Sequence, residues 1–310
     1  MHAVDTETTS QESASMRVRR RLRGDSEEYV RTAARDAILG TPRKLVEARV
    51  TSEGAATSAI AAPMTFRVGP SVAPPPRPGA ITRKVAEIEM FYDTIAERFD
   101  DIMNRYDVHR RIDTIYDVLL GAYDLTGRTL LDAGCGTGWF SAAACERGAN
   151  VTALDIGPRL LEQVRRKCAA KTMVGDVMNL EFRDDTFDVI VSSECIEHTT
   201  DPRRAVSELI RVCKPGGLIA LTCPNRHWRW ACTIANALRL RPYEGLENWP
   251  SWKNLREWMT AGGATIQSMR GIHLFPFQIK MFQPLLRRLD AFGDVLGPWC
   301  VNQAVLAIKS

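Results

Sequence analysis

The stretch Leu131-Asp132-Ala133-Gly134-Cys135-Gly136-Thr137-Gly138 joins an apolar segment to an amphipathic one, and it decides the fold. Three glycines at alternate positions let the backbone turn sharply and let a ligand lie directly against it. A dinucleotide-binding loop would read G-x-G-x-x-G, but Trp139 stands where the third glycine would be. The carboxylate of Asp132 would repel a pyrophosphate and would suit an ammonium or an amino acid group. The loop therefore predicts a strand-to-helix turn that binds a ligand other than a dinucleotide.

Apolar runs and amphipathic segments alternate on both sides of this loop. The runs with the character of strands are residues 129–133, 151–155, 171–175, 187–192, 218–223, 265–272 and 301–308. The segments with helical spacing between them are residues 140–147, 158–167, 202–212 and 252–261. Such alternation predicts an α/β fold, with a mostly parallel sheet and helices on both faces. Residues 81–125 repeat apolar side chains at three- and four-residue steps, which predicts N-terminal cap helices.

Acidic residues stand where the second and third expected strands end. Asp155 closes the second strand, and its carboxylate can accept hydrogen bonds from both hydroxyls of a ribose. Asp176 follows the third strand and can accept a hydrogen bond from an adenine amino group. Open α/β sheets bind ligands at the carboxyl ends of their strands, where the glycine loop also lies. The pattern therefore predicts a nucleoside site beside that loop.

In these blocks the sequence resembles the class I S-adenosylmethionine-dependent methyltransferases over roughly residues 90–310. It is similar to the small-molecule enzymes of ubiquinone and menaquinone biosynthesis. The resemblance implies a Rossmann-like sheet of seven strands, mostly parallel, whose last strand is antiparallel. It implies S-adenosylmethionine as cofactor. The cofactor-binding residues that it implies are Asp132, Gly134, Cys135, Gly136, Thr137, Gly138, Asp155, Ile156, Asp176, Val177 and Ser193.

The segment Ser193-Glu194-Cys195-Ile196-Glu197-His198 follows the fourth expected strand and carries the candidate catalytic groups. A histidine titrates near neutrality, so His198 can act as a general base, with Glu197 as a second catalytic residue. Glu194, Glu197 and His198 could instead hold a divalent metal, as the similar spacing in ubiquinone-biosynthesis O-methyltransferases implies. In a third reading, Glu197 and His198 only cap the turn before Asp201-Pro202. The sequence leaves these alternatives open and does not favour the metal.

The methyl acceptor is expected to be a hydrophobic small molecule. The insertions 227–248 and 274–298 are rich in large apolar residues and would form a lid over the acceptor pocket. Tyr92, Trp228 and Trp230 are the candidate acceptor-binding residues. The second insertion also carries basic residues, so peripheral contact with a membrane is an alternative to simple lid packing. No D/N-P-P-Y/F tetrad follows the fourth strand, which disfavours nucleic acid as the acceptor.

The expected reaction is methyl transfer from S-adenosylmethionine to an oxygen, or alternatively to a nitrogen or carbon. A lipid-linked or saccharide acceptor is one alternative. A non-catalytic partner protein that keeps the cofactor site is an alternative of another class.

The composition separates an N-terminal extension from the rest of the chain. Residues 1–80 contain two aromatic residues and the run Pro74-Pro75-Pro76-Arg77-Pro78, so they are expected to be a disordered extension and linker. Residues 81–310 are expected to form the methyltransferase domain. The eight cysteines form no C-x-x-C pair, and no apolar run reaches the length of a membrane span, so we expect a cytoplasmic protein with free thiols. The sequence does not indicate an oligomeric state.

Overall fold

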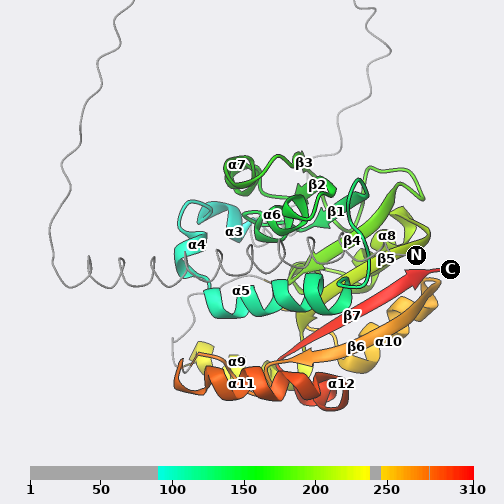
Figure 1. The fold of residues 1–310 in the computed structure, drawn as a ribbon. Helices are drawn as coiled ribbons and strands as arrows, with labels where there is room; N and C mark the ends of the chain where they lie inside the picture. Colours follow the sequence, from blue (N-terminus) through cyan, green and yellow to red (C-terminus); the bar gives the residue numbers. More distant parts are fainter. Residues whose placement is uncertain (1–89, 238–245, 279) are drawn as a thin grey trace, which may run out of the picture. The chain divides into compact units, whose positions relative to one another are not determined.

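A seven-stranded sheet forms the centre of the computed structural model, which describes residues 90–237, 246–278 and 280–310 (Figure 1). The strands lie in the order β3-β2-β1-β4-β5-β7-β6. Only β7 runs antiparallel to its neighbours β5 and β6, so the predicted fold, with its antiparallel last strand, is confirmed. The strands are β1 Thr129–Ala133, β2 Asn150–Asp155, β3 Lys171–Val174, β4 Phe187–Ser193, β5 Cys213–Pro224, β6 Ala264–Ile272 and β7 Asn302–Lys309.

Helices cover both faces of the sheet, because the central strands present apolar side chains on both faces. Leu131 of β1 and Val305 of β7 pack with α8 and α10 in one core, and Leu130 and Leu306 pack with α6 and the π-helix described below in the other. Strands buried on both faces read as continuous apolar runs, which is why the sequence located them. These helices, with α7 beside β2, are α6 Trp139–Glu146, α7 Pro158–Lys167, α8 Pro202–Val212 and α10 Trp252–Ala261.

Strand β5 begins five residues earlier than expected. Cys213 pairs with Phe187, and the register then shifts so that Leu218 pairs with Val189. The glycines of the Lys214–Gly217 bend allow this irregularity, since Gly216 has φ +76°. The residues between the expected helix 202–212 and the expected strand 218–223 therefore form the bulged start of the strand.

The N-terminal cap is divided into short helical pieces. They are α3 Phe91–Thr94, α4 Phe99–Ile102, α5 Arg105–Ile112 and a π-helix, Asp113–Leu119. The Asn104 side chain accepts a hydrogen bond from the Asp107 N–H and begins α5, so the chain turns between α4 and α5. The expected cap residues 81–89 lie outside the described part of the chain.

The two insertions contain helices within their described residues. The first contains α9 Arg229–Ala237, and the second contains α11 Gln283–Leu289 and α12 Gly293–Leu296 (Figure 1). Residues 238–245 of the first, residue 279 of the second and the predicted extension 1–80 lie outside the described residues. Within the described ranges, no helix combines the length and the apolar character that crossing a membrane requires.

Candidate active site

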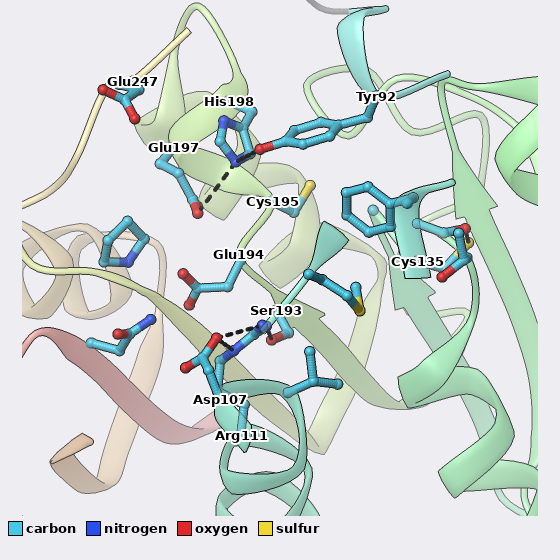
Figure 2. Close-up of a pocket in the computed structure, with 18 of the residues that line it drawn as sticks. Tyr92, Asp107, Arg111, Cys135, Ser193, Glu194, Cys195, Glu197, His198 and Glu247 are labelled. Atoms are coloured by element: carbon cyan, nitrogen blue, oxygen red, sulfur yellow. Dashed lines mark hydrogen bonds and ion pairs between the residues drawn. The ribbon is translucent and has the colours of Figure 1, made fainter. Parts of the chain in front are cut away.

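A cavity of about 920 Å³ opens at the carboxyl ends of β1, β2 and β4. One side is lined by residues 134–137 of the glycine loop and by Asp155, Ile156, Asp176 and Val177, which are among the predicted cofactor-binding residues. The other side is lined by charged and aromatic side chains from the N-terminal helices, from the segment after β4 and from the insertions. Figure 2 shows Cys135 on the first side, Arg111, Glu194 and Glu197 on the second, and Tyr92 and His198 along one edge. We name the two sides the loop half and the lid half.

Asp155 holds the glycine loop in place. Its Oδ2 accepts the Gly136 N–H at 2.8 Å, and its Oδ1 accepts the Gly157 N–H at 2.9 Å. Burial raises the pKa of Asp155, while these two backbone donors oppose that rise. Each carboxylate oxygen can accept two hydrogen bonds, so both can still accept from a ligand hydroxyl.

Glycine is required at position 134 by a close approach. Gly134 has φ +72°, and a Cβ there would lie 2.1 Å from the Cys195 Sγ. A Cβ at Gly136, with φ +52°, would meet nothing within 4 Å. The loop is therefore packed at Gly134 and leaves free space at Gly136.

Two predicted cofactor residues, Asp132 and Gly138, do not line the cavity. Asp132 is 1% exposed and accepts a hydrogen bond from the Ser141 hydroxyl at 2.5 Å. Burial, with a contribution from Asp155, raises the pKa of Asp132 to about 7. Gly138 has φ +89°, and a Cβ there would lie 2.9 Å from Val164. Both residues therefore pack against the protein interior on the side of the loop away from the cavity.

Two aspartates, Asp93 and Asp100, join the short helices α3 and α4 to the loop half by hydrogen bonds and an ion pair. The sequence did not identify either of them as a site residue. The Asp93 Oδ1 accepts the Arg159 and Leu160 N–H groups at the start of α7. The Asp100 carboxylate binds the Thr137 hydroxyl, the Trp139 indole and Lys167. Burial raises the pKa of Asp100, but these partners outweigh burial and lower it.

The ring of His198 has a defined orientation at the cavity edge. Its Nδ1 lies 2.8 Å from the Leu246 carbonyl oxygen and its Nε2 lies 3.2 Å from the Tyr92 hydroxyl. A carbonyl only accepts, so Nδ1 carries the proton, and in the neutral ring Nε2 accepts from Tyr92. The unprotonated nitrogen therefore lies on the Tyr92 side, where α3 contributes to the cavity wall (Figure 2). The Nε2 lies 3.7 Å from the Glu197 Oε1.

Helix α8 follows the turn after His198. The Asp201 side chain accepts the Arg204 N–H and is the N-cap of this helix.

A buried ionic network forms the floor of the lid half. The Arg111 Nε donates to the Asp107 Oδ2 at 2.9 Å, and its Nη1 donates to the Ser193 hydroxyl at 2.9 Å. The second Asp107 oxygen lies 3.1 Å from the Nε2 of His273, which has no exposed surface. Burial raises the pKa of Asp107, but Arg111 and His273 outweigh burial and lower it.

Sequence reasoning missed Asp107, Arg111 and Asn302, which all line the cavity. The only sequence signal for the first two was their i, i+4 spacing within an otherwise amphipathic segment. Asn302 begins β7, and its distance from the motifs along the chain concealed it.

The three candidate metal ligands do not gather into a common site. Among the described residues, no group of three or more His, Cys, Asp and Glu side chains is arranged to hold a metal ion. Glu194 and Glu197 instead face the Arg111 side of the cavity (Figure 2).

The candidate acceptor-binding aromatics divide between the cavity and the surface. Tyr92 and Trp228 line the cavity. The Trp230 ring stacks on the Trp228 ring with centroids 5.9 Å apart, is 58% exposed, and does not line the cavity.

The loop half fits the cofactor that the sequence resemblance implies. It offers an open glycine backbone, a buried carboxylate with accepting capacity at Asp155, and a second carboxylate at Asp176, all on one wall of a cavity large enough for a nucleoside and a second molecule.

Known proteins resemble this chain in sequence and in fold. The sequence family described as "Methyltransferase domain" matches residues 131–221. A malonyl-[acyl-carrier protein] O-methyltransferase of Salmonella typhimurium is 31% identical over 198 residues, which are 57% of this chain and 78% of that protein. A demethylmenaquinone methyltransferase of Paenarthrobacter aurescens is 28% identical over 214 residues, which are 60% of this chain and 85% of that protein.

A solved structure shares the fold. It is a chain from the complex of the Trm112 methyltransferase activator of Haloferax volcanii with a methyltransferase, and it superposes with a TM-score of 0.53 at 18% identity. The match covers 71% of this chain and 97% of that chain. With the family match and the site geometry, these relatives show that the chain belongs to the S-adenosylmethionine-dependent methyltransferases.

Proposed function

We propose that the enzyme transfers the methyl group to a hydroxyl oxygen of a hydrophobic small molecule, with His198 as general base. The observation that carries this proposal is the orientation of the His198 ring. The Leu246 carbonyl fixes the proton on Nδ1, so Nε2 can take the proton of a hydroxyl that replaces the Tyr92 hydroxyl beside it.

The loop half would hold the cofactor. Gly134 to Thr137 would contact its amino acid part, Asp155 and Ile156 its ribose, and Asp176 and Val177 its adenine. When bound, S-adenosylmethionine supplies an electrophilic methyl group on sulfur. The protein's own contribution is to align the acceptor, exclude water and remove the proton.

The lid half supports an apolar acceptor. Five large aromatic side chains line the cavity. They are Phe91, Phe99, Trp228, Trp249 and Phe277. The names of the two relatives support this proposal in part. One is named as an O-methyltransferase, and the other is named as a demethylmenaquinone methyltransferase. We further propose that residues 81–310 form one domain in which the described parts of the two insertions cover the acceptor.

A lipid-linked acceptor is the second candidate, and one observation favours it. Large apolar side chains of the second insertion are exposed, among them Met281 at 76% and Val295 at 73%. Basic residues Arg287 and Arg288 flank them on α11. Such a surface can lie against an anionic membrane that holds the acceptor.

The test is the His198→Ala variant, assayed with labelled cofactor and a pool of phenolic, hydroquinone and aliphatic hydroxyl compounds. We expect the methyl-transfer rate to fall by roughly 10²–10⁴-fold with unchanged affinity for S-adenosylhomocysteine. His227→Ala is the matched control, since His227 does not line the cavity. An unchanged rate in His198→Ala would overturn the general-base role. Loss of activity with a chelator, restored by a divalent metal, would favour the metal alternative.

A further inference from the structure

Three buried oxygens in the lid half lack a hydrogen-bond partner among the described residues. They are the Glu194 Oε1, the Glu197 Oε2 and the Asn302 Oδ1. All three residues line the cavity, Glu197 is 1% exposed and Asn302 is 3% exposed. A buried polar atom without a partner is destabilising, so three on one cavity wall indicate a ligand that would satisfy them. We name this group the acidic subsite.

The backbone of the acidic subsite is strained at Glu194. Glu194 has φ +51°, in the left-handed region that residues other than glycine rarely adopt. Its N–H donates to the Thr222 carbonyl at 2.9 Å, which holds this conformation. Strain of this kind is concentrated at functional sites.

The charge around the acidic subsite is unbalanced. Arg111 is the cation that faces both glutamates, and it is already paired with Asp107. The other charged groups that face the glutamates are Asp107 near Glu194, and Glu247 and His198 near Glu197. Burial raises the pKa of Glu194 and Glu197, and their mutual repulsion adds to the rise at Glu197. When both glutamates are ionised, the carboxylates around the subsite therefore outnumber the cation that faces them.

We propose that the acidic subsite binds a protonated amino group carried by the methyl acceptor. An ammonium supplies up to three N–H donors for three unpartnered oxygens, together with the missing positive charge. A carboxylate would add a further negative charge, and an uncharged hydroxyl would leave the charge unbalanced. The proposal rests on the proposed function and extends it, because the acceptor then has an apolar body and a cationic head.

Calorimetry tests the proposal on the full chain saturated with S-adenosylhomocysteine. The probes are n-octylammonium, n-octanol and octanoate, which share one apolar chain and differ in the head group. We expect n-octylammonium to bind at least about tenfold more tightly than either of the others, the scale of one charged hydrogen bond. Equal binding of n-octanol, tighter binding of octanoate or no binding of n-octylammonium would overturn the proposal.

Isosteric variants connect the preference to the acidic subsite. Glu194→Gln and Glu197→Gln should each reduce the preference for n-octylammonium to less than about threefold. Glu257→Gln, at an exposed acid on α10 outside the cavity, should leave the preference unchanged. A preference that persists in both cavity variants would place the ammonium elsewhere and contradict the proposal.

Proton release gives a readout that a purely structural role would not change. Because the pKa of both glutamates is raised, a protonated glutamate must ionise to pair with an ammonium, so binding should release protons and should tighten as the pH rises. Calorimetry in two buffers of different ionisation enthalpy measures this release. Binding of Mn²⁺ that both variants abolish would instead assign a metal site. If the probes do not bind as expected while methyl transfer to hydroxyl compounds is unchanged, this inference is rejected and the proposed function stands.

Discussion

The two halves of the cavity hold their carboxylates in different ways. In the loop half, neutral donors bind them: two backbone N–H groups for Asp155 and a serine hydroxyl for Asp132. In the lid half, Asp107 is bound by the Arg111 guanidinium, while Glu194 and Glu197 each have one oxygen with no hydrogen-bond partner among the described residues. The carboxylates Asp155 and Asp132 are therefore hydrogen-bonded by neutral groups of the protein, and the glutamates of the lid half are hydrogen-bonded only in part.

This difference indicates which half is complete before a ligand binds. A loop whose hydrogen bonds are internal keeps one shape, as the binding of a constant cofactor requires. Buried oxygens without partners leave capacity for a particular polar group, which suits the half that must choose the acceptor.

The largest effect should come from breaking the ionic floor of the lid half. Asp107→Ala leaves the Arg111 guanidinium buried without its carboxylate, so we expect the free energy of unfolding to fall by about 3–5 kcal/mol. Urea unfolding measures this loss. The matched control is Asp113→Ala, which breaks a partly exposed ion pair with Arg110, whose guanidinium keeps its second partner Asp290, and should cost about 0–1 kcal/mol. Equal losses in the two variants would show that the buried network is not special.

A pH-dependent effect should come from Asp132 in the loop half. The native state raises its pKa from 3.8 to about 7. The native state therefore binds more protons than the unfolded state between about pH 4 and about pH 7, and Asp132 makes unfolding easier as the pH rises through that range, by roughly 3 kcal/mol in all.

The Asp132→Asn variant removes this titration. No cation pairs with Asp132 among the described residues, so we expect the variant to gain stability relative to the wild type between about pH 5 and about pH 7.5. Urea unfolding at both pH values checks this. A stability difference that is independent of pH would mean that Asp132 stays ionised in the native protein.

The sequence predicted the loop half closely because its signals are local. Pro158 and Pro202 mark the first turns of α7 and α8, which begin at those residues. Glycines mark the loop itself, and Gly134 has the positive φ and the close contact that only glycine accepts. Each element could be located from a few neighbouring residues.

The lid half could not be predicted in the same way because its contacts join distant parts of the chain. Asp107 meets His273 across 166 positions, and Arg111 meets Ser193 across 82. Nothing in the periodicity of α5 distinguishes Arg111 from a solvated arginine. Glu194 and Glu197 were identified as chemical groups, but their unpartnered oxygens are visible only after β7 brings Asn302 beside the same cavity.

The most direct test of the account is calorimetry with S-adenosylhomocysteine on the wild type and on Asp155→Ala, with Asp117→Ala as an exposed control. The account predicts that the wild type binds, that Asp155→Ala weakens binding by about 1–3 kcal/mol, and that the control binds as the wild type does. Absence of binding to the wild type, or equal binding by Asp155→Ala, would contradict a cofactor site in the loop half.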